Sequence, residues 1–290
     1  MNSLNLKSLI IIPVGVGLIF TMLINGWTLL TGGDTTHLEY LNYYNRTNVD
    51  QYPSYYTILL YLTAVLQLIT SVFLAIALIR REFLADKNAK FFKWGIFFSI
   101  LSVVLYGFMV RLLSNHGASA TLYFYVGVLY FCLWYVEQND NNLNHKIFTR
   151  IKILPIYFTI FYTMGFPGWQ KIVNSTEVMG GYIKLFSNSF LSKIPGGIEP
   201  FIYFLGILEI SVPILLILSL IKKEFLLNIP TQFLDWSIFI SVCTFVMLSL
   251  GLGVVLNYPG STNLIFYAVF TMGLYSYICT SKRAIKTCSL

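Results

Sequence analysis

The chain has 290 residues, of which 57% are hydrophobic, 17% aromatic and only 11% charged. Soluble domains carry roughly a quarter of their residues as charges, so a soluble globule of this size would have too few to cover its surface. The composition also excludes intrinsic disorder, a collagen and a nucleic-acid-binding surface, because the net charge of +7 comes from scattered Lys and Arg and not from a basic tract. The composition therefore predicts a polytopic protein whose partner is the lipid bilayer.

Eight stretches have the roughly 20 mostly apolar residues that a helix needs to cross the hydrocarbon core. In chain order they are 9–30, 56–79, 92–113, 121–137, 151–169, 198–221, 235–256 and 263–280. Apolar residues surround each predicted helix on all sides, as expected for membrane spans. Strands of a membrane barrel would show short alternating segments instead. The predicted fold class is an all-α integral membrane protein with eight transmembrane helices.

Basic residues gather in every second connection between these spans. Fourteen of the 19 Lys and Arg residues lie before the first span or after the second, fourth, sixth and eighth. The other five are Arg46, Arg111, Lys171, Lys184 and Lys193. Because cytoplasmic connections are enriched in Lys and Arg, this distribution predicts a multi-pass protein of the cell membrane with both termini in the cytoplasm.

The chain matches itself without a gap when it is shifted by 142 residues. The shift places Gly26-Trp27 on Gly168-Trp169, and 80–84 (Arg-Arg-Glu-Phe-Leu) on 222–226 (Lys-Lys-Glu-Phe-Leu). Each copy holds four spans, so both copies enter the membrane from the same side as a parallel repeat. The predicted organisation is two four-helix bundles, 1–137 and 151–290, joined by a polar cytoplasmic linker at 138–150.

The second copy resembles the DoxX family of small four-helix membrane proteins. Gly168-Trp169-Gln170-Lys171 ends one span, Gly196-Gly197 follows in the loop, and Leu208-Glu209 lies in the next span. This is similar to the family pattern, in which the first span ends in Gly-x-x-Lys and the second carries a Glu. The first copy has Leu29 and Gln67 at those two positions, and is therefore the degenerate one.

Some members of this family are subunits of thiosulfate:quinone oxidoreductase, and others are linked to thiol redox balance. The resemblance implies an accessory subunit of a membrane redox system, with quinone as the implied cofactor and a redox protein as the implied partner. No metal, haem or nucleotide motif occurs in the sequence, so whether the chain is itself an enzyme stays open. A small-molecule transporter or channel is the alternative, since parallel repeats also build transport paths. A non-catalytic scaffold or assembly factor is another.

Glu209 is the candidate catalytic residue, because it lies about 11 residues into its span and therefore near the bilayer centre. It either relays protons or binds a polar ligand, or it is an interhelical clamp. Lys171 either extends to the headgroups or binds an anionic group. Glu199 begins the next span on the same side and can pair with Lys171. These three residues form the candidate ligand-binding set.

The four cysteines form no Cys-x-x-Cys, and none lies in a predicted outer loop, so the sequence predicts neither a disulfide framework nor a dithiol relay. The three histidines, His37, His116 and His145, are expected in loops and have no second ligand at a metal spacing. No metal site is predicted.

Overall fold

The structure is a computed structural model that describes residues 9–45, 50–84, 87–138, 146–173, 175–226 and 229–288. Most of the predicted linker at 138–150 lies outside these residues, as do His145 and the last two residues of the chain. All regular secondary structure in the described ranges is helical. The chain divides into two compact units, Met1–Pro155 (unit 1) and Ile156–Leu290 (unit 2).

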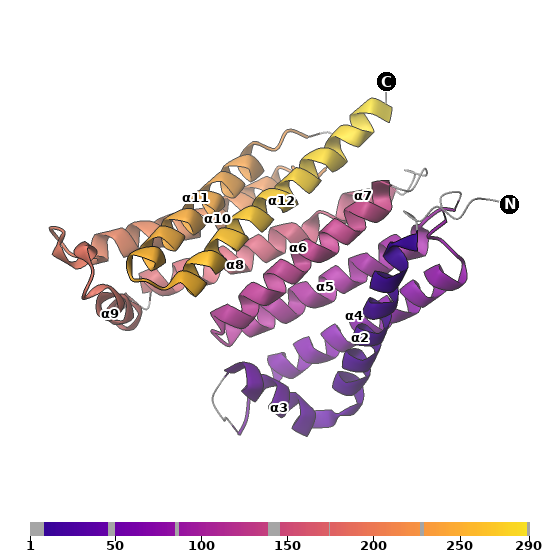
Figure 1. Ribbon diagram of the computed structural model, residues 1–290, viewed down its shortest axis with the longest axis horizontal. Helices are drawn as coiled ribbons and strands as arrows, with labels where there is room; N and C mark the ends of the chain where they lie inside the picture. Colours follow the sequence, from indigo (N-terminus) through magenta and orange to yellow (C-terminus); the bar gives the residue numbers. More distant parts are fainter. Residues whose placement is uncertain are drawn as a thin grey trace. The chain divides into compact units, whose positions relative to one another are not determined.

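Unit 1 contains four long helices and two short ones. They are α2 (Ile11–Thr31), α3 (Gly33–Asn45), α4 (Ser54–Ile79), α5 (Lys90–Leu112), α6 (His116–Gln138) and α7 (Lys146–Ile151). Figure 1 shows α4, α5 and α6 side by side, with the short α3 beside the end of α2 and the start of α4. The loop predicted after the first span therefore contains a helix. Leu29, Leu60 and Val110, none of them exposed, belong to the core at this end of the unit.

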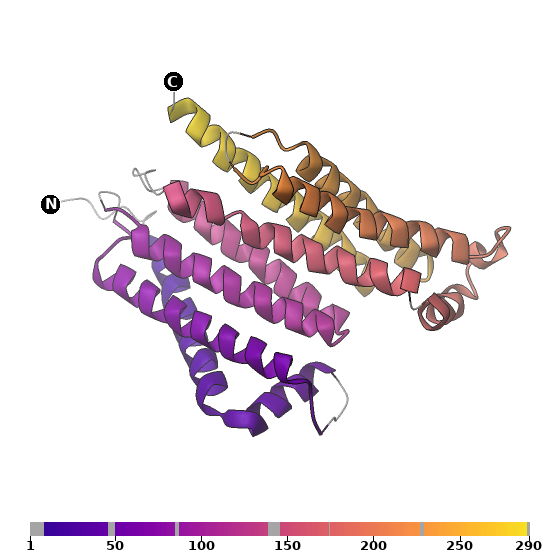
Figure 2. The ribbon, with the colours of Figure 1, turned by 180° about the vertical axis from the view of Figure 1, so that it is seen from behind.

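Unit 2 has a similar set of helices. They are α8, which begins at the unit boundary (Leu154–Val173), α9 (Ser175–Phe186), the 3₁₀ helix η1 (Phe190–Lys193), α10 (Glu199–Ile221), α11 (Gln232–Val254) and α12 (Tyr258–Cys288). Figure 2 shows α9 and η1 at one end of this unit, beside the start of α10. Met179 and Phe186 of α9 pack against Ile198, Ile202 and Leu205.

Seven helices in the described part of the chain are long and apolar enough to cross a membrane, namely α2, α4, α5, α6, α10, α11 and the Tyr258–Lys282 part of α12. Many of their large apolar side chains are exposed, including Trp27, Phe131 and Leu250. Exposed apolar faces on long helices fit a lipid environment, so the structure supports a multi-pass membrane protein. The fifth predicted span corresponds to α8, which has 20 residues and is not among the seven.

Two helices begin about five residues before the predicted spans, because polar caps extend them. Asn115 precedes α6, and its Oδ1 accepts a hydrogen bond from the backbone N–H of Ala118 at 3.0 Å. Asn257 precedes α12, and its Oδ1 accepts from the N–H of Gly260 at 3.1 Å. Hydropathy does not mark these first turns, because they contain polar and glycine residues.

Candidate functional site

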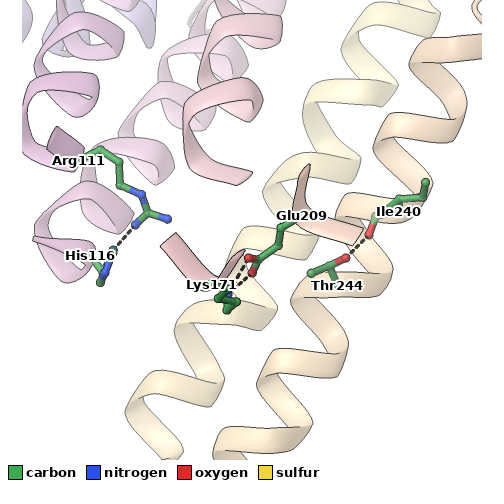
Figure 3. Close-up of polar contacts among 6 residues, drawn as sticks. All are labelled: Arg111, His116, Lys171, Glu209, Ile240 and Thr244. Carbon is green, nitrogen blue, oxygen red and sulfur yellow. Dashed lines mark hydrogen bonds and ion pairs between the residues drawn. The ribbon is translucent and has the colours of Figure 1, made fainter. Parts of the chain in front are cut away.

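Lys171 and Glu209 form a buried ion pair in unit 2. Lys171 lies in the last turn of α8 and Glu209 in the middle of α10. The Lys171 Nζ atom is 2.6 Å from each carboxylate oxygen of Glu209, as Figure 3 shows. The two side chains are only 3% and 2% exposed. The structure thus brings together two of the three residues in the predicted ligand-binding set.

Two glycines allow α8 and α10 to approach closely at this point. A Cβ atom on Gly168 would lie 2.8 Å from the Glu209 Cβ and 3.0 Å from the Ile210 backbone nitrogen. A Cβ atom on Gly206 would lie 3.1 Å from the Lys171 Cβ. Gly168 and Lys171 are three residues apart and therefore share one face of α8. Small residues at membrane helix crossings commonly bring backbones together in this way, and here the close approach holds the ammonium against the carboxylate.

The short helix α9 covers the ion pair from one end. The Lys171 Nζ atom lies 5.9 Å from the centre of the Tyr182 ring, within range of a cation–π contact. Met179 is 6% exposed and anchors α9 in the core described above. Aromatic and apolar side chains therefore shield the pair, which strengthens its attraction by lowering the local dielectric constant.

Glu199 is not part of this site. It lies in the first turn of α10 and is exposed. Ten residues of helix separate it from Glu209, a rise of about 15 Å. The predicted pairing of Lys171 with Glu199 is therefore wrong, and so is the predicted extension of Lys171 to the headgroups. Lys171 instead turns toward the carboxylate that neutralises it inside the unit.

The corresponding crossing in unit 1 has the same backbone contact without the charges. A Cβ atom on Gly26 would lie 3.0 Å from the Gln67 Cβ and 3.2 Å from the Leu68 Cγ. Adding 142 to these numbers gives Gly168, Glu209 and Ile210, the residues of the contact in unit 2. Leu29 stands where Lys171 would be, and it is not exposed.

His37 is a buried residue of unit 1 that sequence reasoning placed in a loop. It lies in α3, is 2% exposed, and its Nε2 atom is 2.7 Å from the backbone oxygen of Leu29. Its ring also meets the Tyr61 ring edge to face, with 4.6 Å between ring centres. The spacing of His37, Leu41 and Tyr44 fits one face of a helix and is the signal that could have identified this position.

Two further polar contacts occur in unit 1. Arg111 of α5 has its Nη1 atom 2.7 Å from the Nδ1 atom of His116, the first residue of α6 (Figure 3). The Lys152 Nζ atom is 2.6 Å from a carboxylate oxygen of Glu137. Burial lowers the pKa of Lys152 from its usual value, an effect that the Glu137 charge opposes. Both contacts join residues at helix ends, and neither forms a set of convergent catalytic groups.

In the described ranges, no group of three or more His, Cys, Asp and Glu side chains could hold a metal ion. The three cysteines whose side chains are described, Cys132, Cys243 and Cys279, are free thiols. No protein-family model, no curated protein and no solved structure matches this chain.

Proposed function

We propose that this chain is a tandem membrane protein of the DoxX-like type that serves as an accessory subunit of a quinone-linked redox system. The observation that carries the proposal is the contact between Lys171 and Glu209. The family pattern consists of a Gly-x-x-Lys at the end of one span and a Glu in the next. Gly168, Lys171 and Glu209 supply that pattern here and meet at one helix crossing. A joint physical role for residues from two separate segments supports the resemblance.

The matched geometry of the two units supports an internal duplication. Helices α5 and α11 begin and end 142 residues apart. The non-glycine residues with positive φ described in the chain form two pairs at the same offset: Arg81 with Lys223 at 54° and 57°, and Ser114 with Leu256 at 57° and 59°. Such left-handed residues are uncommon, and membrane composition alone does not place them in register. Two parallel copies of one four-helix unit account for these pairs.

The same reasoning favours α8 as the eighth membrane span. Its last residue, Val173, lies 142 residues after Thr31, the last residue of α2. An eighth span returns the chain to the side on which it began. The alternation of basic connections then places both termini in the cytoplasm and the protein in the cell membrane.

In this proposal the ion pair is a structural clamp. Lys171 and Glu209 neutralise each other, and α9 covers them. A buried pair of this kind specifies how α8 and α10 cross, and so shapes the surface that the bundle presents to other proteins. Electron-transfer groups then belong to the redox partner, because the chain has no cofactor motif of its own. Unlike a proton relay, this role requires no exposed acid.

The experiment that tests the proposal is purification of the full chain from its native membrane in a mild detergent, followed by mass spectrometry of bound proteins and quinone. We expect a redox protein in fixed stoichiometry, together with quinone. Substrate-dependent flux in liposomes made from the purified chain would favour a transporter instead. A stoichiometric partner without a redox centre, in a preparation without quinone, would favour a scaffold and overturn the redox assignment.

A further inference from the structure

Unit 1 has a polar centre of its own, which begins with His37. The His37 Nε2 atom lies 2.7 Å from the Leu29 backbone oxygen. A carbonyl oxygen can only accept, so Nε2 carries the hydrogen, and in the neutral ring Nδ1 is left as an acceptor. Nδ1 is buried and has no hydrogen-bond partner among the described residues. His37 therefore holds a fixed, unused acceptor inside the unit.

Gln67 holds a second unused acceptor close to the first along the chain of contacts. Its side chain is in a residue only 4% exposed, and its Oε1 atom has no partner in the described ranges. The Gln67 Cβ packs against Gly26, while His37 bonds to the carbonyl of Leu29. Gly26 and Leu29 are three residues apart on α2, a rise of about 4.5 Å. Both acceptors therefore lie along the seam between α2 and α4.

The matching positions in unit 2 explain why this seam needs a donor. There Lys171 and Glu209 stand in place of Leu29 and Gln67, so the chain supplies both the donor and the acceptor. In unit 1, Leu29 has no polar side chain, and His37 adds another acceptor where unit 2 has Met179. Buried acceptors are unfavourable without a donor, particularly in a membrane, where the lipid provides none.

We infer that the seam formed by α2, α3 and α4 is a binding site for a hydroquinone, whose hydroxyls donate to His37 Nδ1 and Gln67 Oε1. The choice of a quinol as the hydroxyl donor rests on the proposed quinone-linked function. A quinol presents two hydroxyl donors at opposite ends of an aromatic ring. The oxidised quinone presents only carbonyl acceptors, which find no donor at these two atoms. The site therefore selects the reduced form, and unit 1, the degenerate copy by its motif, is the ligand-binding half.

The surroundings of the seam suit an aromatic ligand that arrives from the lipid. Trp27 of α2 and Tyr61 of α4 are 60% and 37% exposed, and Tyr61 contacts the His37 ring. Helix α3 is joined to α2 through Gly33, whose φ of +64° is a conformation that suits glycine. Near its far end, α3 borders a pocket of about 390 Å³ that is lined partly by Tyr43 and Tyr44. Space beside α3 lets it shift and admit a ring next to His37.

Calorimetric titration of the full chain in detergent with duroquinol, and separately with duroquinone under the same anaerobic conditions, tests this site. We expect duroquinol to bind at least about tenfold more tightly than duroquinone, because a site that accepts hydroxyl hydrogens rejects a ligand without them. His37→Phe and Gln67→Leu should each weaken duroquinol binding by about tenfold or more. Gln67→Glu keeps the acceptor and should retain binding. Met179→Leu, at the position in unit 2 that matches His37, is the control and should leave the affinity unchanged.

Equal affinity for the two forms, tighter binding of duroquinone, or duroquinol binding that survives both His37→Phe and Gln67→Leu would overturn the site. The same holds if the acceptors are occupied by water alone and duroquinol does not bind. The proposed function is tested separately by the redox partner. Selective duroquinol binding without a redox partner supports the site and removes the accessory-subunit role. A redox partner without selective binding supports the role and removes the site.

Discussion

The Nζ atom of Lys171 lies 2.6 Å from both carboxylate oxygens of Glu209, so one ammonium group bridges the two oxygens of a single acid inside unit 2. The pair joins the last turn of α8 to the middle of α10 at a crossing that two glycines make close. Each charge is buried only because the other is present, and this mutual dependence can be measured.

Lys171→Leu should destabilise the protein by about 3–5 kcal/mol, because it leaves the Glu209 carboxylate buried without its cation. The double variant Lys171→Leu/Glu209→Gln recreates the combination of Leu29 and Gln67 in unit 1 and should recover most of that loss. The measurement is the free energy of unfolding in detergent. Lys184→Leu, on the exposed side of α9, is the control and should change it by less than about 0.5 kcal/mol. A fully stable single variant would show that the pair is not a clamp.

Gly168→Ala should destabilise unit 2 by about 1–3 kcal/mol, since the new methyl group would overlap Glu209 and the backbone of Ile210. Gly26→Ala should act similarly in unit 1. The control is Gly273→Ala in α12, where an added Cβ meets nothing within 4 Å. That change should stabilise the helix by up to about 1 kcal/mol. Thermal unfolding of the three variants compares them, and equal effects at all three positions would argue against the close crossings.

Glu224→Ala should destabilise the protein by about 2 kcal/mol, near the upper end for the loss of a helix cap. The Glu224 carboxylate accepts hydrogen bonds from the backbone N–H groups of Phe233 and Leu234, and from the hydroxyl of Ser219. These groups lie at the start of α11 and the end of α10, so one side chain fastens both helices. Denaturant titration measures the loss. Glu199→Ala, which removes an exposed acid, should cost less than about 1 kcal/mol.

Leu256→Gly should stabilise the protein by roughly 0.5–1 kcal/mol. Leu256 has a φ of 59° and a side chain that is 70% exposed, so the residue bears backbone strain with little burial in return. Relief of a left-handed conformation is worth about 1–2 kcal/mol, and the added flexibility of glycine offsets about half of it. Leu250→Gly, at a similarly exposed position inside α11, should instead cost about 1 kcal/mol. Chemical denaturation distinguishes these opposite signs.

Single cysteines at Arg80 and Lys222, in a background without the native cysteines, should both react with an impermeant thiol reagent from the cytoplasmic side. Both positions follow a long helix, α4 and α10 respectively. Cysteines at Ser114 and Leu256 should react from the opposite side. If α8 does not cross the membrane, Lys222 and Leu256 exchange sides while Arg80 and Ser114 do not. Labelling in intact cells therefore distinguishes eight spans from seven.

The sequence by itself determined the solvent of this protein, its helical class and the positions at which its two halves match. Hydropathy and residue spacing are local properties, so the predicted spans coincide with long helices of the structure. The same local reading failed at Asn115 and Asn257, where a capping side chain and not hydrophobicity begins the helix. It also missed α3, whose helical spacing is short and polar.

Only the tertiary structure decided which polar groups meet. Lys171 had two acids within its expected range in the sequence, and the rotation and close crossing of α8 and α10 chose Glu209 over Glu199. The return of α3 onto α2 buried His37 against the carbonyl of Leu29. Such pairings depend on helix rotation and on contacts between segments distant in the chain. Neither composition nor spacing contains that information.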